Sequence, residues 1–341
     1  MADSMSRILI ETIVRRTLKD LKDSPERSIR NLVDMALSSS EGRFQRSFFS
    51  VAETMLKNEN SAYYDIIKDT VANVETERIL QFGMNLGYNS CTEGAEKIRK
   101  KEAAGGFNIP WTISMDVDMK KIMEDPECYD AVLTQGKKLG IYTWMLRVHG
   151  LLQEVLPLMR RHTDCAFVLF CEPSDLTPAF LDCMTDVRHL MLAVRYDENA
   201  GDVYSQLRKR QFFYSVFFVY REKDAESIVS GDLFYSTEQL HPVFTAVFPD
   251  ATCPQEARDR VYSAISGFHT EQDFQTLPLD MVQDIRYIDS VISGDDCLVS
   301  FDADGRLYSR QEKEKSLNMF EQPLEDILRQ AFSKDSEAPG A

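Results

Sequence analysis

Six short apolar runs in the second part of the chain constrain its fold more than any other feature. The runs are rich in Val, Ile, Phe and Tyr, and they cover residues 111–116, 141–147, 165–171, 190–195, 212–220 and 243–248. Four of the five gaps between them have the length and pattern of a helix. Such alternation predicts an α/β fold with a parallel sheet covered by helices. Six units with a short seventh favour a βα barrel, partial or complete, over a flat sheet.

The first hundred residues follow a different pattern. From residue 5 to about 104, apolar residues recur at helical spacing, so we expect an all-α N-terminal domain over residues 1–105. Ser24, Pro25 and Glu26 supply an N-cap, a proline at the first helical position and an early acid for one helix. Later helices are expected at about 43–57, 61–73, 75–86 and 92–104. Gly105 and Gly106 end the last of them.

The end of the chain is expected to add a hairpin and a helix. Two short apolar runs flank Asp302-Ala-Asp-Gly305, which favours a hairpin over a calcium loop, because Arg306 occupies a ligand position and the glycine comes too early. The barrel with its hairpin then covers residues 106–310, and residues 311–341 hold a helix from Leu317 to Phe332 and a disordered tail.

The charge balance narrows the classes of partner. Thirty-nine basic and 55 acidic residues give a net charge of -16, which disfavours nonspecific binding to nucleic acid or anionic membrane and favours a basic partner. No stretch approaches the ~20 apolar residues of a spanning helix, and the first residues lack the pattern of a signal peptide. We therefore expect a cytoplasmic protein.

The cysteines and histidines show no metal-ligand spacing. Seven cysteines are scattered along the chain, and the closest pair, Cys165 and Cys171, has five residues between its members. No CxxC pair is present, so we expect buried reduced thiols, no bound metal and no cofactor. Four further histidines are expected to be surface or cap residues rather than ligands: His162, His189, His241 and His269.

Three segments carry a resemblance to a known family. Residues 107–111 lead into an apolar strand that ends at Asp116, and a helix follows almost at once; residues 133–140 and 162–167 complete the frame. This frame resembles radical S-adenosylmethionine (radical SAM) enzymes, in the branch with a helical N-terminal extension and a C-terminal SPASM-like region. The resemblance implies a barrel of radical SAM type with a CxxxCxxC cluster motif after the first strand. Residues 116–121 contain no cysteine, and Cys128 lies inside a predicted helix.

Other segments also lack the residues that the family uses to bind its cofactor and its clusters. Residues 148–151 (Val-His-Gly-Leu) stand where the family has a glycine-rich GGEP segment, and residues 289–294 and 307–310 lack the cysteines that would hold auxiliary clusters. A cluster needs three or four thiolates at one place. The resemblance therefore implies a degenerate member of the family without the iron-sulfur machinery.

The candidate binding residues are identified by their position in the chain alone. In a βα barrel the site lies at the carboxyl ends of the strands, which form the mouth of the barrel. The side chains expected there are Asp116, Asp118, Arg147, His149, Glu172, Arg195, Tyr196, Arg221 and Asp250. Arg147 and Arg195 could bind an anion, and His149 could act as a general base. Asp116 and Asp118 could either bind magnesium or cap the following helix. The other interpretation is that these charges pair with each other across a disused cleft.

Two functions follow from these patterns. The first is a noncatalytic pseudoenzyme, a radical-SAM-like protein that acts as a binding, regulatory or scaffolding module for an intact radical SAM enzyme or a peptide. The alternative is a cluster-independent enzyme or small-molecule sensor that uses the mouth. A mouth filled by bulky apolar side chains favours the first, and convergence of Arg147, His149 and Arg195 favours the second.

Overall fold

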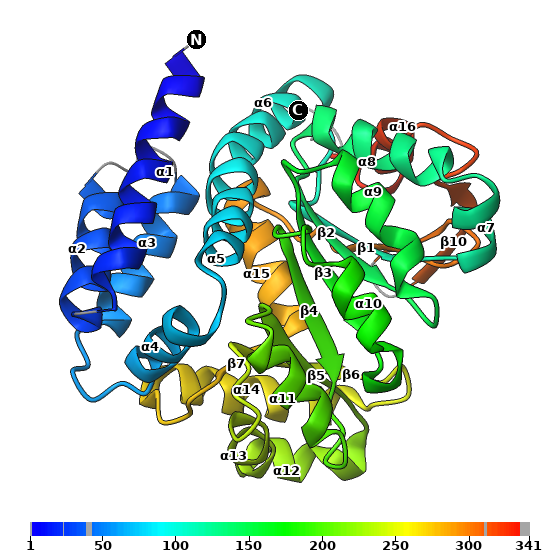
Figure 1. Cartoon of the computed structure of the whole chain (residues 1–341). Coiled ribbons are helices and arrows are strands. Elements are labelled where there is room, and N and C mark those ends of the chain that lie inside the picture. The colour runs from blue at the N-terminus through cyan, green and yellow to red at the C-terminus, as the bar shows by residue number, and fades with distance from the viewer. Residues whose placement is uncertain (1, 23, 39–42, 310–311, 335–341) are drawn as a thin grey trace.

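The computed structural model describes residues 2–22, 24–38, 43–309 and 312–334, and one sheet of ten described strands forms its centre (Figure 1). The order is β10-β9-β8-β1-β2-β3-β4-β5-β6-β7. Strands β8 and β1 to β7 pair in parallel, and β9 and β10 run antiparallel. Among the described residues β7 and β10 are the two edges, so the predicted parallel βα barrel is confirmed in its partial form.

The strand bounds agree closely with the apolar runs. The parallel strands are β1 Thr112–Asp116, β2 Thr143–Arg147, β3 Ala166–Cys171, β4 Leu190–Arg195, β5 Tyr214–Tyr220, β6 Phe244–Pro249, β7 Leu277–Asp280 and β8 Val299–Phe301. The antiparallel strands are β9 Arg306–Ser309 and β10 Glu312–Asn318. Strands buried on both faces read as continuous apolar runs, which is why these segments stood out in the sequence.

Helices separate the parallel strands in sequence. They are α7 Met119–Glu124, α8 Glu127–Leu139, α9 Leu156–Arg161, α10 Pro178–Cys183, α11 Gly201–Lys209, α12 Ala225–Val229, α13 Asp232–Glu238, α14 Gln255–Glu271 and α15 Met281–Ser293, with short 3-10 turns at Leu152–Val155, Pro173–Asp175 and Glu222–Asp224. Local chemistry fixes their starts: the Thr177 hydroxyl accepts from Phe180 N at 3.2 Å and caps α10. The predicted βα alternation is confirmed.

The described part of the first 105 residues is helical, as predicted. The helices are α1 Ala2–Asp20, α2 Pro25–Ser38, α3 Arg43–Met55, α4 Tyr63–Asn73, α5 Thr76–Gly83, the π-helix η1 Met84–Gly94 and α6 Ala95–Gly105. Figure 1 shows α1, α2 and α3 side by side, apart from the sheet. The expected break between residues 86 and 92 is wrong, because η1 joins α5 to α6. Its amides Asn85 and Asn89 donate to backbone carbonyls of residues 163–165, a tertiary contact that sequence spacing does not reveal.

The main core joins the sheet to the helix that precedes it. Ala95 and Ile98 of α6 are fully buried in the same cluster as Ile113 of β1 and Trp144 of β2. A Cβ added at Gly136 of α8 would lie 2.4 Å from the Trp144 ring, so the glycine allows the helix to pack over the indole. α6 ends at Gly106, whose φ of 67° suits a residue without a Cβ.

The C-terminal segment differs from the prediction. The hairpin is confirmed: β8 and β9 pair antiparallel, and Asp302 Oδ1 accepts from Arg306 N at 2.8 Å. The predicted helix is too long, because residues 312–318 pair with β9 as β10 and α16 runs only from Leu324 to Ala331. Pro323 precedes that helix and cannot donate to the turn before it. Lys334 N donates to Gly106 O at 2.8 Å, so the predicted disordered tail does not begin at Ser333, and residues 335–341 lie outside the described residues.

A buried carboxylate on α15 should make stability depend on pH. Asp289 is fully buried, its Oδ1 accepts from Trp111 N at 3.2 Å, and Cys297 lies beside its carboxylate. Burial raises the pKa of Asp289 to about 8, against about 3.9 in an unfolded chain. Between these values the folded state holds a proton that the unfolded state has lost, so the free energy of unfolding falls as pH rises through this window.

We expect Asp289→Asn to reduce that loss. The amide keeps an acceptor for Trp111 N and carries no charge, so the stability lost between pH 5 and 8 should shrink by at least about 1 kcal/mol. Urea unfolding at both pH values measures this, with the exposed Asp197→Asn as the control. Equal pH dependence in the two variants would contradict the assignment of the loss to Asp289.

Candidate functional site

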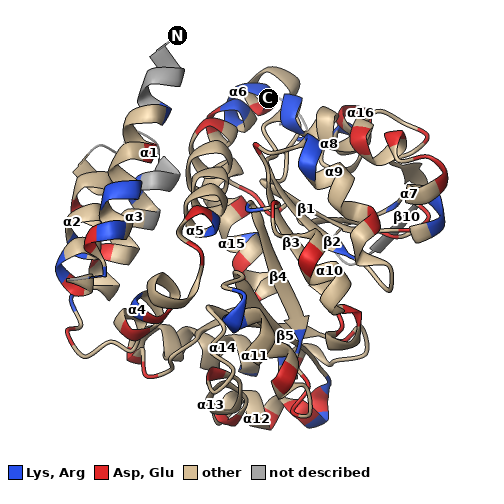
Figure 2. Ribbon diagram, in the orientation of Figure 1, with Lys and Arg blue, Asp and Glu red and all other residues tan. Residues whose placement is uncertain are grey.

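The predicted mouth residues come together in pairs rather than as one cluster. Asp116 ends β1 and Arg147 ends β2, and the parallel register sets them opposite each other. Arg147 Nε lies 3.1 Å from Asp116 Oδ1. Figure 2 shows that charged residues lie mainly on the helices and loops of the molecule and that the strands carry few of them.

Two further pairs repeat the arrangement along the sheet. Glu172 after β3 lies 3.3 Å from Arg195 at the end of β4, and Arg221 after β5 lies 3.9 Å from Asp250 after β6. Each arginine is about half exposed or more, so each pair contributes no more than about 1 kcal/mol to stability. These pairs matter for binding more than for stability, because the charge of each of these arginines is already balanced by a carboxylate from a neighbouring strand end.

The neighbourhood of Asp116 combines four charged or titratable groups. Burial raises the pKa of Asp116, while Arg147 and then His149 act in the opposite direction, and Asp302 of the hairpin turn adds to the rise. His149 is exposed. A half-buried acid, its arginine and an exposed imidazole are able to hold a small polar group. Arg147 ends β2 and His149 follows it in the next loop, whereas Arg195 lies two strands away.

Aromatic side chains lie between the charged pairs. The register sets Phe170 of β3 opposite Arg147, and Phe217 of β5 opposite Arg195, so both rings share the face of the arginines. Ring centroids are 5.3 Å apart for Phe170 and Phe217, 5.5 Å for Phe170 and Phe248, and 6.0 Å for Phe217 and Phe248, all edge to face. Phe170 and Phe217 are buried, and Phe248 is half-buried. We call these three residues the aromatic floor. Phe170 lies on the strand between those of Arg147 and Arg195, which run roughly 10 Å apart, and Phe217 and Phe248 lie on the next two strands beyond Arg195.

Asp118 caps a helix. Its Oδ1 accepts from Lys120 N at 2.9 Å and from Lys121 N at 3.3 Å at the start of α7, and its own N–H donates to Tyr129 OH at 2.9 Å. The N-cap interpretation thus fits, and its carboxylate is occupied by the helix. Only Val117 and Asp118 separate β1 from α7, so there is no room for a cluster-binding loop at this position.

Arg195 and Tyr196, two of the predicted mouth residues, line a shallow hollow. Arg195 and Tyr196 share a space of about 340 Å³ with Glu172, Asp197 and Glu198. The Tyr196 ring packs against Phe218 at 6.3 Å. Three carboxylates against one guanidinium give this hollow a negative rim, which suits a cation rather than an anion.

The cysteines do not converge on a cluster site. All seven lie in the described part of the chain, on separate elements or at opposite ends of β3, and they form no disulfide there. The one metal-ligand group found among the described residues contains a single cysteine, Cys165. Three thiolates at one place are required, so the residues present do not fit a [4Fe-4S] cluster of radical SAM type. The expectation of buried thiols is confirmed for four cysteines, Cys165, Cys171, Cys253 and Cys297. It is wrong for Cys183, which is exposed at the end of α10, and Cys91 and Cys128 are only half-buried.

Two histidines are more buried than expected. His162 and His189 are each 3% exposed, because the turns that carry them pack beneath the start of β3. His189 Nε2 lies 3.0 Å from Met159 O, and His162 Nε2 lies 3.0 Å from Asp130 Oδ1.

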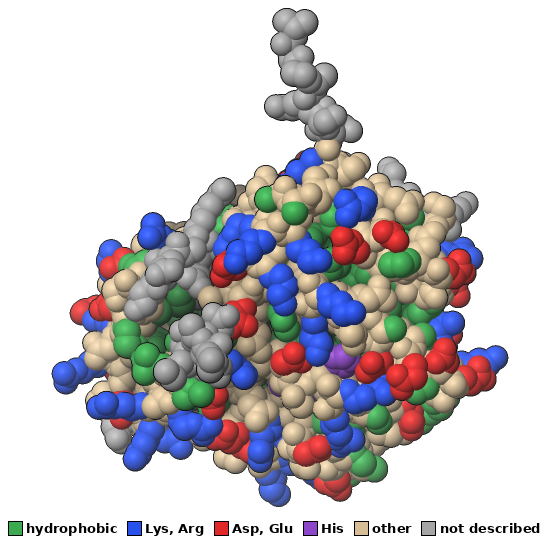
Figure 3. All heavy atoms as spheres, turned by 90° about the horizontal axis from the view of Figure 1, so that it is seen from above, with side chains coloured by type: hydrophobic (Ala, Val, Ile, Leu, Met, Phe, Trp, Pro, Cys, Tyr) green, Lys and Arg blue, Asp and Glu red, His purple; other side chains and the backbone are tan. Residues whose placement is uncertain are grey.

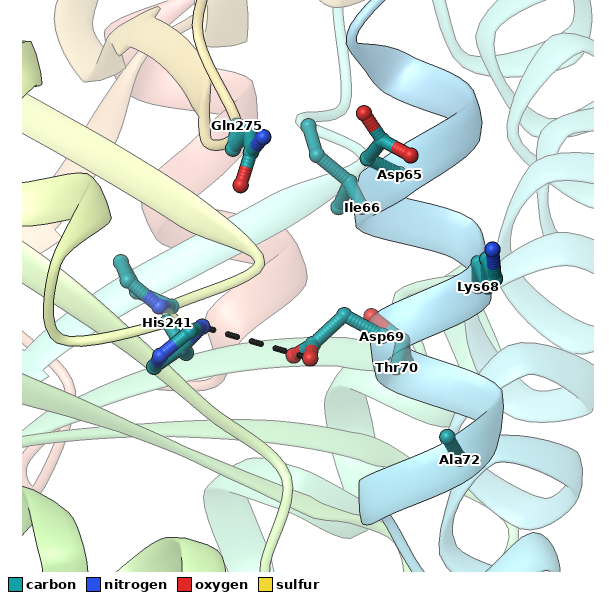
Figure 4. Close-up of a pocket in the computed structure, with 9 residues that line it drawn as sticks. Asp65, Ile66, Lys68, Asp69, Thr70, Ala72, His241 and Gln275 are labelled. Carbon is teal, nitrogen blue, oxygen red and sulfur yellow. Dashed lines mark ion pairs between the residues drawn. The ribbon is translucent and has the colours of Figure 1, made fainter.

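A second hollow of about 360 Å³ lies between α4 and the turns before β6 and β7 (Figure 4). Asp69 of α4 points toward His241 there, with Nδ1 at 4.0 Å, and accepts two hydrogen bonds from Arg208 at 2.7 and 2.5 Å. The charge of this carboxylate is therefore balanced by Arg208, and the contacts join α4 to α11 and to the turn before β6. Sequence reasoning missed this group because its members are far apart in the chain.

Comparison with known proteins adds a likeness of fold. No helix of the described chain is both long and apolar enough to cross a bilayer. No protein-family model matches the chain, and no curated protein matches its sequence. The crystal structure of Streptococcus suis SuiB bound to S-adenosylmethionine aligns with a TM-score of 0.49 and 9% identity, over 68% of this chain and 66% of that one. Native anSMEcpe with bound AdoMet and Cp18Cys peptide aligns with a TM-score of 0.43 and 6% identity, over 63% and 80%. These likenesses concern the fold alone.

Proposed function

We propose that this chain is a noncatalytic, radical-SAM-like binding module. The observation that most supports the proposal is the pairing at the mouth: Arg147, Arg195 and Arg221 each lie beside an acid from a neighbouring strand end. A catalytic mouth needs groups free to act on a substrate. Here the charges compensate one another around an aromatic floor.

The alternative, a cluster-independent enzyme or small-molecule sensor, requires Arg147, His149 and Arg195 to converge. Phe170 stands on the strand between Arg147 and Arg195 and occupies the shared face. The Arg195 guanidinium is directed to Glu172, 3.3 Å away. The geometry therefore favours the binding module.

The rim of the mouth indicates the chemistry of the partner. Glu172, Asp197 and Glu198 outnumber Arg195 around the hollow, and the whole chain carries a net charge of -16. Long-range attraction favours a basic segment and disfavours nucleic acid and anionic membrane. We propose that this hollow binds a basic peptide segment, either free or on an intact radical SAM enzyme, in the cytoplasm.

Anaerobic reconstitution with iron and sulfide tests the loss of catalysis. We expect well under one iron per chain and no stoichiometric cluster chromophore, because the thiols lie on separate elements. A radical SAM enzyme with an intact CxxxCxxC loop, treated in parallel, validates the procedure, and Cys165→Ser shows whether residual iron binds at that thiol. About four irons per chain with a cluster spectrum would refute the noncatalytic assignment.

A further inference from the structure

The turn between α9 and β3 gathers three metal-ligating side chains. One ligand atom from each of His162, Asp164 and Cys165 lies within 4.8 Å of the other two. Cys165 N donates to His162 O at 3.0 Å, and this tight turn brings the three side chains together. His162 and Cys165 are buried, and Asp164 is half-buried. The spacing His-x-Asp-Cys matches no familiar ligand pattern, so the sequence does not reveal the group.

The hydrogen bonds of His162 leave one of its ring nitrogens available to a metal ion. Its Nε2 lies 3.0 Å from Asp130 Oδ1 on α8, and its buried Nδ1 has no hydrogen-bond partner among the described residues. Burial is the main cause that lowers the pKa of His162. A neutral imidazole that donates from Nε2 to a carboxylate carries its lone pair on Nδ1. Metal-binding histidines commonly have such a carboxylate on the other ring nitrogen.

We propose that His162, Asp164 and Cys165 bind a divalent transition metal ion of the zinc type, with Asp130 as a positioning residue. Nitrogen, carboxylate oxygen and thiolate are the ligands that zinc prefers, and a water completes four-coordination. Tetrahedral bonds of about 2.0 to 2.3 Å set neighbouring ligand atoms roughly 3.3 to 3.5 Å apart. Cys165 Sγ and Asp164 Oδ1 are 4.0 Å apart, so the turn must close only slightly. Binding releases the thiol proton to solvent.

The turn is held in place by the elements around it. Asn85 Nδ2 donates to Cys165 O at 2.7 Å, and Asn89 Nδ2 donates to Asp164 O at 2.8 Å, both from η1. The metal would thus join η1, α8, α9 and β3 at the end of the sheet opposite the mouth. Figure 1 shows β4 running downward, and the view from above in Figure 3 shows Lys and Arg side chains crowded on the face where the strands begin. A metal at this end would have a structural role.

Lys137 provides a test specific to a metal site. Its Nζ lies 3.0 and 3.2 Å from the two oxygens of Asp164, so it competes with a cation for that carboxylate. Lys137→Gln removes the competitor and should tighten metal binding several-fold. A turn with no metal-binding capacity would gain none from this change.

Titration of the metal-free full chain with zinc and with cobalt(II) tests the proposal. We expect one ion per chain at micromolar affinity or better, with a sulfur-to-cobalt charge-transfer band that reports the thiolate. His162→Gln and Cys165→Ser should each weaken binding at least 100-fold, and Asp130→Asn about 10- to 100-fold. Cys171→Ser, at the other end of β3, is the matched control and should leave affinity unchanged.

Several results would overturn the proposal. Binding weaker than about 0.1 mM in the wild type, equal affinity in Cys165→Ser, or a charge-transfer band lost in Cys171→Ser would each show that the turn is not a metal site. Circular dichroism checks the fold of every variant. If His162→Gln does not fold, Asp130→Asn and Lys137→Gln still decide the matter, because they must change the affinity in opposite directions.

Discussion

Replacing Arg78 with alanine should lower the free energy of unfolding by about 3 to 5 kcal/mol. Arg78 lies on α5 and is only 2% exposed. Its guanidinium donates to Val187 O at 2.9 Å and to Thr185 O at 2.6 Å, and lies 4.5 Å from the centroid of the Phe212 ring. Truncation would leave two backbone carbonyls and the Glu75 carboxylate, 3.1 Å from Nε, without this partner. The loss is large because the guanidinium is shielded from water.

Arg188→Ala is the matched control for this variant. Arg188 pairs with the same acid, Glu75, at 2.9 Å, but its side chain is 41% exposed, so we expect a loss below about 1 kcal/mol. Urea unfolding followed by circular dichroism measures both. Similar small losses in the two variants would contradict the view that Arg78 holds α5 against the loop before β4.

The domain boundary near residue 105 stays a prediction, although α5 and α6 contribute to the main core.

The parallel strands were the part of the fold most open to prediction. Runs such as 165–171 and 190–195 are apolar on both faces, and only a covered parallel strand accounts for them. Elements whose placement depends on tertiary contacts were not predictable. The π-helical link η1 is held by Asn85 and Asn89 against residues 163–165, and β10 exists because β9 offers it a free edge.

The candidate site shows the same limit. Position at a strand end identified Asp116, Arg147 and Arg195, but whether they converge depends on register, which periodicity does not supply. The same register sets Phe170 and Phe217 among them, and the aromatic floor was therefore missed. His162 was misjudged for a related reason, because its burial comes from how the turn packs beneath β3.

The chain should bind S-adenosylmethionine no more tightly than millimolar. The resembling family holds this cofactor through the cluster iron and through a glycine-rich segment after the second strand. In this chain residues 116–121 contain no cysteine, and the buried Val148 lies at the position that the resemblance assigns to the glycine-rich segment. Losing a bidentate metal contact and its neighbouring anchor should cost about 4 kcal/mol, which converts micromolar affinity to millimolar.

Anaerobic isothermal titration of the full chain with S-adenosylmethionine tests the central proposal that this chain is a radical-SAM-like binding module without a working cofactor site. A radical SAM enzyme with its cluster in place provides the positive control, and Phe170→Ala shows whether the aromatic floor blocks the space. We predict no saturation below about 1 mM in the wild-type chain. Saturable micromolar binding at one site per chain would mean that the cofactor pocket survives, and would contradict the account.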